Sequence, residues 1–394
     1  MNTGLNRAWV EINLDHIAHN VREVVNRVGK MTEVMAAVKA DAYGHGVFET
    51  VPTLLENGVS RLAVSMLDEA IQLRGIGVKV PILVLSYTDP IRAEEIVQYN
   101  ITQTVFSHDL PKALSRAAVK LGKESRIHIK IDTGMTRVGF ASGYSAVKDV
   151  VEISKLPGVV IEGLFSHFSS ADEAERDYTM LQYERFESII QELNRIGILI
   201  PVKHIGNSGA ILQYPNLDLD MVRPGIILYG LYPSDAVDKS VIDLKPAMSF
   251  KAKVVLVKEV ESGVPVSYGR TFVTRRKSRI ATIPIGYADG YSRFLSNRGR
   301  VLIHGHYAPV IGNICMDQCM VDVTDIPFEV KTGDEAVIFG SQGNKEISVD
   351  EVAKLQQTIH YEVVCLIGKR VPRVYLKEGK IVNIVNYLHA MPIF

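Results

Sequence analysis

The chain has 394 residues, 47% of them hydrophobic and 22% charged, which is typical of a globular protein with room for two domains. Its 44 basic residues balance its 44 acidic residues, so the charge gives no support for binding to nucleic acid or to a membrane surface. No apolar run reaches the length of a membrane-spanning helix, and the N-terminal stretch lacks the pattern of a signal peptide. We therefore expect a cytoplasmic protein.

The three cysteines, Cys315, Cys319 and Cys365, are an odd set without the CxxC spacing of a zinc site. Each lies among apolar neighbours, so we expect buried free thiols and no metal centre.

Short apolar strands alternate with amphipathic helices over the first two-thirds of the chain. The eight expected strands are 34–38, 62–64, 81–85, 102–106, 127–131, 159–165, 202–205 and 221–229. The clearest helical patterns are 15–28, 108–121 and 174–196. Eight strand–helix units predict a closed parallel (β/α)8 barrel of the TIM type over residues 1–240. In such barrels function lies at the C-terminal strand ends, where Lys39, His167 and the 206–209 turn fall.

The pattern changes near residues 233–246, after which strand-like runs dominate. They cover 250–260, 278–285, 299–303, 309–311, 320–323, 335–339, 371–376 and 381–385, separated by turn signals. We expect a second, mostly β domain over residues 241–394. Residues 9–14 alternate like a strand and are a candidate for pairing with it.

Lys39 lies in the segment AVKADAYGHG, where an apolar strand runs out into a glycine-rich loop. Partial desolvation there lowers the pKa of a lysine and favours the neutral amine, which is the form that reacts with an aldehyde. The alternative is a lysine whose stem lies along apolar surface while its charge stays in water, and spacing alone favours this alternative.

Other motifs follow in order along almost the whole chain. They are KIDTGMTRVGF (130–140), SHFSSAD (166–172), HIGNSGA (204–210), MVRPGIILYG (221–230), VSYGRTF (266–272), GYADGYSR (286–293), GNICMDQ (312–318) and YEVVC (361–365). With the Lys39 segment, this ordered set resembles the alanine racemases, fold-type-III enzymes that use pyridoxal 5′-phosphate (PLP). The resemblance implies that Lys39 bonds to PLP. It assigns further cofactor contacts to Tyr43, Arg137, His167, Asn207, Ser208, Arg223, Gly225, Ile226 and Tyr361.

Arg223 resembles the arginine that faces the pyridine nitrogen, with His167 supporting it. Arginine cannot give up its proton at ordinary pH, so the cofactor would be a weaker electron sink, as racemisation requires. Related decarboxylases have an acidic residue there instead. Without the resemblance, a structural salt bridge would explain Arg223, and an ordinary capped turn would explain Asn207 and Ser208.

Racemisation needs a proton acceptor on each face of the α-carbon, and the resemblance assigns these roles to Lys39 and Tyr268. Met316 and Arg137 resemble substrate-binding residues, and Lys130 resembles a lysine that is often carbamylated. In the family the tyrosine and methionine come from the partner subunit, which implies a homodimer with shared active sites. Asp172, Tyr287 and Arg293 resemble residues lining the entrance.

The sequence therefore predicts an alanine racemase that interconverts L- and D-alanine and supplies D-alanine for peptidoglycan. A biosynthetic and a catabolic role both remain open. The alternatives are a broader amino-acid racemase that also accepts serine, a fold-type-III decarboxylase, and a non-catalytic PLP-binding protein. Arg223 argues against the decarboxylase, and the β domain with Tyr268 argues against the non-catalytic protein. His360 and Lys369 carry no assigned role.

Overall fold

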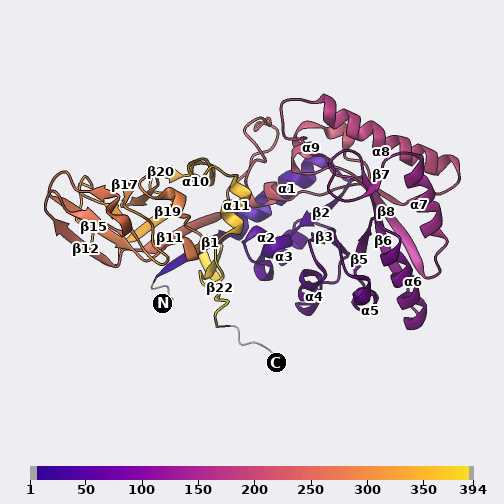
Figure 1. Ribbon diagram of the computed structural model, residues 1–394, viewed down its shortest axis with the longest axis horizontal. Coiled ribbons are helices and arrows are strands. Elements are labelled where there is room, and N and C mark those ends of the chain that lie inside the picture. The colour runs from indigo at the N-terminus through magenta and orange to yellow at the C-terminus, as the bar shows by residue number, and fades with distance from the viewer. Residues whose placement is uncertain (1–6, 390–394) are drawn as a thin grey trace. The chain divides into compact units, whose positions relative to one another are not determined.

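A computed structural model describes residues 7–389, which form two compact units (Figure 1). The barrel unit comprises His16–Ala42 and Val47–Pro246. The β unit comprises the described residues from Ala247 onward, those up to Asp15, and the short segment Tyr43–Gly46. No helix within residues 7–389 has both the length and the apolar character needed to cross a membrane.

The barrel unit is built on parallel strands that pair in the order β10, β2, β3, β4, β5, β6, β8 and β9. Their bounds are Glu33–Ala37 (β2), Arg61–Val64 (β3), Ile82–Val84 (β4), Thr102–Val105 (β5), Ser125–Asp132 (β6), Val159–Phe165 (β8), Val202–His204 (β9) and Met221–Val222 (β10), with β7 (Phe140–Ala141) beside β6. Between β9 and β10, the N–H of Asp220 donates to the carbonyl of Lys203 over 3.1 Å. The predicted (β/α)8 barrel is confirmed in a nearly closed form.

The last barrel strand is shorter than the predicted 221–229. Strand β10 ends at Val222, and Ile226–Tyr229 forms a 3₁₀ helix instead (η3). Pro224 explains the break, because proline has no N–H to donate to a neighbouring strand.

Helices separate the barrel strands, and Figure 1 shows α4, α5 and α6 outside them. The helices are α1 (Leu14–Val28), α2 (Lys39–Tyr43), α3 (Val47–Glu56), α4 (Leu67–Gly75), α5 (Ala93–Gln98), α6 (Asp109–Leu121), α7 (Tyr144–Ser154), α8 (Asp177–Arg195) and α9 (Ser208–Gln213), with 3₁₀ turns at Pro90–Arg92 (η1) and Pro215–Leu217 (η2). A buried apolar cluster joins five strands through Met35, Ala63, Leu83, Val202 and Met221. Apolar residues along both faces of short strands suit such two-sided burial.

The β unit has one large sheet in the order β12, β15, β18, β17, β16, β19, β11, β1, β21 and β22, with β20 beside β19. Its elements are β1 (Ala8–Asn13), β11 (Met248–Lys253), β12 (Leu256–Val260), β13 (Pro265–Val266), η4 (Tyr268–Arg270), β14 (Phe272–Val273), β15 (Ser278–Ile283), η5 (Tyr287–Asp289), η6 (Arg293–Leu295), β16 (Arg300–Ile303), β17 (His306–Ile311), β18 (Cys319–Asp322), β19 (Glu335–Gln342), β20 (Lys345–Ile347), α10 (Val349–Gln356), α11 (His360–Cys365), β21 (Arg373–Lys377) and β22 (Lys380–Val385). The predicted mostly β region is confirmed. The N-terminal strand β1 pairs antiparallel with β11 and parallel with β21.

The cysteine prediction is only partly right. Cys319 is buried, but Cys315 is half-buried and Cys365 is exposed. Cys365 ends the short helix α11, and its apolar neighbours Val363 and Val364 occupy the buried face. Apolar neighbours in sequence therefore did not imply burial for this thiol, because a helix turns successive residues toward different sides.

Candidate active site

Positive side chains gather at the C-terminal strand ends of the barrel unit. Lys39 follows β2, Lys130 lies near the end of β6, and Arg223 follows β10. Arg137 lies on the segment after β6, and His167 comes two residues after the end of β8. The charges of Arg223, Arg137, Lys130 and Lys39 all act on His167 and lower its pKa, after burial, which is the largest cause. Lys39, Lys130, Arg137, His167 and Arg223 therefore share one electropositive region.

Lys130 is the buried amine of this region, with a relative exposure of 3%. Its Nζ donates to the backbone carbonyl of Ile131 over 2.6 Å and lies 5.6 Å from the centre of the Phe165 ring. Burial, followed by the charge of Arg223, lowers the pKa of Lys130 to about 7. A large fraction of this lysine is thus an uncharged amine at neutral pH.

Arg223 is held by four contacts. Its Nη1 donates to Nδ1 of His204 over 2.6 Å, and its Nη2 donates to Nδ1 of His167 over 3.0 Å. Nη2 also donates to the carbonyls of Ser166 (2.8 Å) and Ile205 (3.2 Å). Burial and the charge of Arg137 lower the pKa of Arg223 to about 9, so the guanidinium remains a cation at neutral pH. Its Nε has no hydrogen-bond partner among the described residues and can donate to a ligand.

The turn after Lys39 is left-handed. Ala40, Asp41 and Ala42 have φ of 53–54° and ψ of 49–52°, and Tyr43 has a φ of 54°. The sequence predicted a loop here, whereas the structure has a left-handed helical turn. This conformation is unfavourable, because left-handed alanine costs about 1–2 kcal/mol per residue. Such strain persists only where neighbouring groups enforce it.

Two carboxylates stabilise the left-handed turn. Glu69 Oε1 accepts from the N–H of Ala40 over 2.6 Å, and its Oε2 accepts from the N–H of Ser65 over 2.7 Å. Asp41 Oδ1 accepts from the N–H of Val47 over 2.9 Å. Glu69 is a functional candidate that sequence reasoning missed, since nothing in LDEA near position 69 distinguishes it from an ordinary helix-start glutamate.

Two short segments of the barrel unit lie side by side: the one that follows β9 and the one that precedes η3. Asn207 caps α9 by accepting from the N–H of Ala210 over 3.0 Å, and Ser208 Oγ accepts from the N–H of Gly225 over 3.0 Å. The structure thus brings Asn207, Ser208, Gly225 and the adjoining Ile226 together, although the two pairs are far apart in sequence. Hydroxyl and N–H groups of this kind suit an anion such as a phosphate.

In the β unit, Tyr43 and Tyr361 lie close to each other. Their ring centres are 6.3 Å apart, and burial raises the pKa of Tyr43. His360 stacks on Tyr361 at 4.8 Å, and its Nδ1 lies 3.0 Å from Asp350 Oδ1. His360 therefore packs against the Tyr361 ring and limits its movement, a role that the sequence did not reveal.

Tyr268 and Met316 lie on two β-unit loops that are tied together. Ser267 Oγ donates to the carbonyl of Asn313 over 2.5 Å, and Asn313 Nδ2 donates to the carbonyl of Tyr268 over 2.7 Å. Both side chains are exposed, by 72% for Tyr268 and 52% for Met316. The N–H of Met316 makes no hydrogen bond to any described residue, so it can donate to a ligand.

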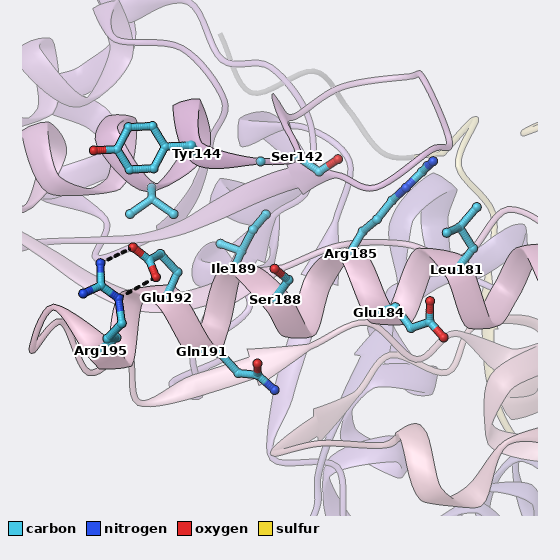
Figure 2. A pocket seen from close by; sticks show the side chains of 12 residues that line it. Ser142, Tyr144, Leu181, Glu184, Arg185, Ser188, Ile189, Gln191, Glu192 and Arg195 are labelled. Atoms are coloured by element: carbon cyan, nitrogen blue, oxygen red, sulfur yellow. Dashed lines mark hydrogen bonds and ion pairs between the residues drawn. The ribbon is translucent and has the colours of Figure 1, made fainter.

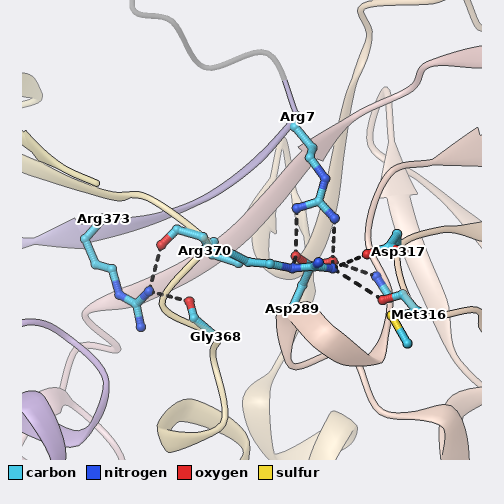
Figure 3. Close-up of polar contacts among 9 residues, drawn as sticks. Arg7, Asp289, Met316, Asp317, Gly368, Arg370 and Arg373 are labelled. Carbon is cyan, nitrogen blue, oxygen red and sulfur yellow. Dashed lines mark hydrogen bonds and ion pairs between the residues drawn. The ribbon is translucent and has the colours of Figure 1, made fainter. Parts of the chain in front are cut away.

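A buried carboxylate orders the neighbouring loops (Figure 3). Asp289 is fully buried, and Arg7 and Arg370 converge on it, each with a 2.7 Å contact. Arg370 also pairs with Asp317 over 2.6 Å and donates to the carbonyl of Met316 over 3.4 Å. These arginines were not among the predicted residues, because their partners are 282 and 81 positions away in sequence.

The predicted entrance residues fall in different units. Asp172 is half-buried in the barrel unit, beside Gly209, where an added Cβ would lie 2.8 Å from the Asp172 nitrogen. Tyr287 and Arg293 are exposed residues of the β unit, in η5 and η6. Lys369 is exposed next to Arg370.

A groove of about 840 Å³ runs between α7 and α8 on the barrel unit. Figure 2 shows that Tyr144 lies over it and that Glu192 and Arg195 pair at one end. None of the sequence-predicted site residues line this groove. The groove is therefore separate from the candidate site.

The sequence matches two family profiles, "Alanine racemase, N-terminal domain" over residues 12–233 and "Alanine racemase, C-terminal domain" over residues 247–375. Alanine racemase 1 of Clostridium acetobutylicum is 50% identical over 380 residues, which is 96% of this chain and 98% of the relative. The alanine racemase of Methanococcus maripaludis is 48% identical over 368 residues, covering 93% and 98%.

Solved structures agree with these relatives. The alanine racemase of Clostridium difficile 630 superposes with a TM-score of 0.93 at 42% identity, covering 97% of this chain and 98% of that one. That of Bacillus anthracis, solved with bound L-Ala-P, gives a TM-score of 0.91 at 36% identity, covering 98% and 99%. With its barrel, its β-rich second unit and its cationic strand-end cluster, this chain belongs to the alanine racemase family.

Proposed function

We propose that this protein is a PLP-dependent racemase that interconverts L- and D-alanine. The observation that carries the proposal is the cluster of Lys39, Lys130, Arg137 and Arg223 at the strand ends of the barrel, around a neutral His167. Cations that lower one another's pKa are stabilised by an anionic ligand, and both PLP and an amino-acid carboxylate supply negative charge.

The donor set fits PLP. Lys39 offers an amine, the turn of Ser208 and Gly225 offers hydroxyl and N–H groups for a phosphate, and Arg223 Nε offers a donor for a ring nitrogen. When bound, the cofactor withdraws electrons from the α-carbon of the amino acid and so acidifies the α-proton. Arg223 can only donate, so it would supply a hydrogen bond to the ring nitrogen and would not accept a proton from it.

Two residues move the proton. Lys39 exchanges it on the face of the D-isomer, and Tyr268 of the partner subunit exchanges it on the face of the L-isomer. A tyrosine has an ordinary pKa of about 10, so neighbouring cations must help it act as a base at neutral pH. One group on each face allows proton removal and delivery without turning the substrate over.

The active form is a homodimer with shared sites. Tyr268 is 72% exposed and Met316 is 52% exposed, with the Met316 N–H open to a carboxylate. Groups so exposed are poor binding residues until another surface covers them. Supply of both residues to the partner subunit provides that cover.

Alanine is the preferred substrate in this proposal, and serine is a slow one. Tyr43 and Tyr361 lie 6.3 Å apart and limit the space for a side chain to little more than a methyl group. Lys130, with a pKa of about 7, offers the neutral amine that carbon dioxide needs to form a carbamate, whose negative charge would orient Arg137.

The test is chiral analysis with mass detection after the purified, PLP-supplemented protein has been incubated with L-alanine in heavy water. D-Alanine carrying one α-deuterium is the expected product. Unlabelled L-alanine as the only amino acid recovered would refute the assignment, and serine would then be tested in the same mixture.

A further inference from the structure

A chain of buried polar side chains crosses the interior of the barrel unit. It runs from Arg223 through His204, His128 and Glu162 to Arg61. The successive contacts measure 2.6, 2.8, 3.1 and 3.2 Å. Arg223 stands at the C-terminal strand ends, whereas Arg61 is the first residue of β3. The chain therefore links the candidate active site to the opposite end of the barrel.

Its members are closed off from water. His128 and His204 have no exposed surface, and the side chains of Glu162 and Arg61 are only 11% and 13% exposed. Glu33, which pairs with Arg61 over 2.6 Å, is the outermost residue at 41% exposure. Buried polar atoms that cannot reach water depend on one another for hydrogen bonds.

The hydrogen-bond donors and acceptors along this chain of side chains have one consistent arrangement. Arginine only donates, so Nδ1 of His204 must accept and Nε2 must carry the proton of the neutral ring. Nε2 of His204 then donates to Nδ1 of His128, whose own Nε2–H donates to the Glu162 carboxylate. The donor Arg223 at one end and the acceptor Glu162 at the other therefore favour the same tautomer, protonated at Nε2, for both histidines.

The backbone leaves room for this arrangement. Gly163 lies opposite His128 in the β6–β8 ladder, and a Cβ built on it would stand 2.5 Å from His128 Nδ1. Phe165 stacks on His204 with ring centres 4.8 Å apart. A glycine beneath one imidazole and a ring against the other fix both histidines in place.

We propose that His128 and Glu162 are positioning residues for the racemase: they fix the tautomer of His204, which in turn holds the guanidinium of Arg223 in its orientation. This inference rests on the proposed function. Neither residue touches the candidate ligand site directly, and both act through His204. The charge states agree, since burial lowers the pKa of His128 and of His204, which keeps both rings neutral.

Glu162 is the fixed end of the chain. Burial by itself would raise its pKa, but the hydrogen bond from His128 and the charge of Arg61 outweigh burial and lower the pKa to about 2. A carboxylate can only accept, whereas the amide of a glutamine can also donate. Glu162→Gln therefore permits the reversed order, in which His204 presents an N–H to the donor of Arg223.

The experiment is ¹⁵N NMR of histidine-labelled holoenzyme combined with steady-state kinetics, with signals assigned through His128→Gln and His204→Gln. In the wild type we expect both rings to be protonated at Nε2 only. In Glu162→Gln we expect Nδ1-protonated signal for His204 and a fall in kcat of about tenfold, with KM changed less. Glu33→Gln is the matched control, since Glu33 touches Arg61 but neither histidine, and it should change neither readout.

Gly163→Ala is the second variant, because it displaces His128 without removing a polar group. His204 then loses the acceptor of its Nε2–H, so kcat should fall and the ¹⁵N signals of His204 should shift while Nε2 keeps its proton. A wild-type His204 protonated at Nδ1, or a Glu162→Gln enzyme with unchanged tautomers and kcat, would overturn the inference. If Glu162→Gln fails to fold, the same readouts on Gly163→Ala decide the matter. The expected tautomers in a protein that racemises no amino acid would refute only the proposed function.

Discussion

The two units prepare their functional groups in opposite ways. In the barrel unit, Arg223 is 5% exposed and held by four hydrogen bonds, and Lys130 is 3% exposed. In the β unit, Tyr268 and Met316 are more than half exposed, although their backbones are tied together through Asn313. The barrel thus fixes the side chains of Arg223 and Lys130, whereas the β unit fixes the loops that carry Tyr268 and Met316 and leaves those two side chains exposed. In the proposed function, the fixed barrel side chains suit the binding of a cofactor, and the exposed β-unit side chains suit a contribution to a partner subunit.

Lys39→Ala should have the largest effect, because in the proposed mechanism it removes both the covalent anchor and one of the two proton carriers. We expect kcat for alanine to fall by at least about 10⁴-fold, a loss typical of a covalent residue. Borohydride treatment followed by mass spectrometry should attach PLP to the wild type and not to the variant. Lys155→Ala, at the exposed end of α7, is the control. Continued PLP attachment in Lys39→Ala would mean that another amine is the anchor.

Tyr268→Phe tests whether the β unit acts across an interface. Alone, the variant should lose about 10²–10⁴-fold in racemisation, as expected for one acid–base group. Equal amounts of Tyr268→Phe and Lys39→Ala chains, unfolded and refolded together, should regain about a quarter of wild-type activity, because half the dimers carry one intact site. No recovery, with mixed dimers verified by mass, would place both residues in the same chain's site.

The buried histidines should make the barrel unit sensitive to acid. His128, His167 and His204 have folded pKa values below the ordinary 6.5, with burial as the first cause. The unfolded chain then binds protons first, so stability is full above about pH 6.5 and falls below it, by up to ~1.4 kcal/mol per pH unit for each histidine. Hydrogen exchange from pH 7.5 to 5.5 should show weaker protection in β6, β8 and β9 than in the β unit. Equal losses in both units would contradict this assignment.

Glu69→Ala should have the smallest effect of the four. It removes the carboxylate that accepts from Ala40 and Ser65, which should cost about 1–3 kcal/mol of unfolding free energy. Loosening the left-handed turn should also lower kcat, since Lys39 begins that turn. Glu94→Ala, which loses only the exposed pair with Lys120, should be close to neutral in urea unfolding.

Sequence patterns predicted the fold well where hydrophobic periodicity dominates. The strand 159–165 matched β8 to the residue, and the alternation at 9–14 became β1. The prediction of the strand 221–229 was wrong because it followed the apolar run and passed over Pro224, which has no N–H for the ladder. The left-handed turn was unpredictable for a similar reason: alanine has no preference for positive φ, so Glu69 and tertiary contacts decide it.

The candidate site could be drawn from the sequence where its motifs are contiguous, but not where it depends on distant contacts. Lys39 lies after a strand, as expected, whereas Arg223 was expected inside the strand 221–229 and instead follows β10. The roles of both residues stay predictions. His128 and Glu162 lie inside predicted strands that are otherwise mostly apolar, and nothing in those strands indicates that the two side chains contact each other. Asp289 lies in the motif GYADGYSR, in which only Tyr287 and Arg293 were predicted to be functional. Its partner Arg370 lies 81 positions away in sequence.

The ordered hydrogen bonds behind Arg223 constrain any attempt to redirect the chemistry. A decarboxylase-like site would need an acidic side chain at position 223, which accepts where arginine donates. His204 would then have to present Nδ1–H, and His128 would have to reverse with it. Glu162 can only accept, so it would have to become a donor as well. A change from racemase to decarboxylase chemistry would therefore need substitutions at both ends of this hydrogen-bonded series. Arg223→Glu would have to be combined with Glu162→Gln.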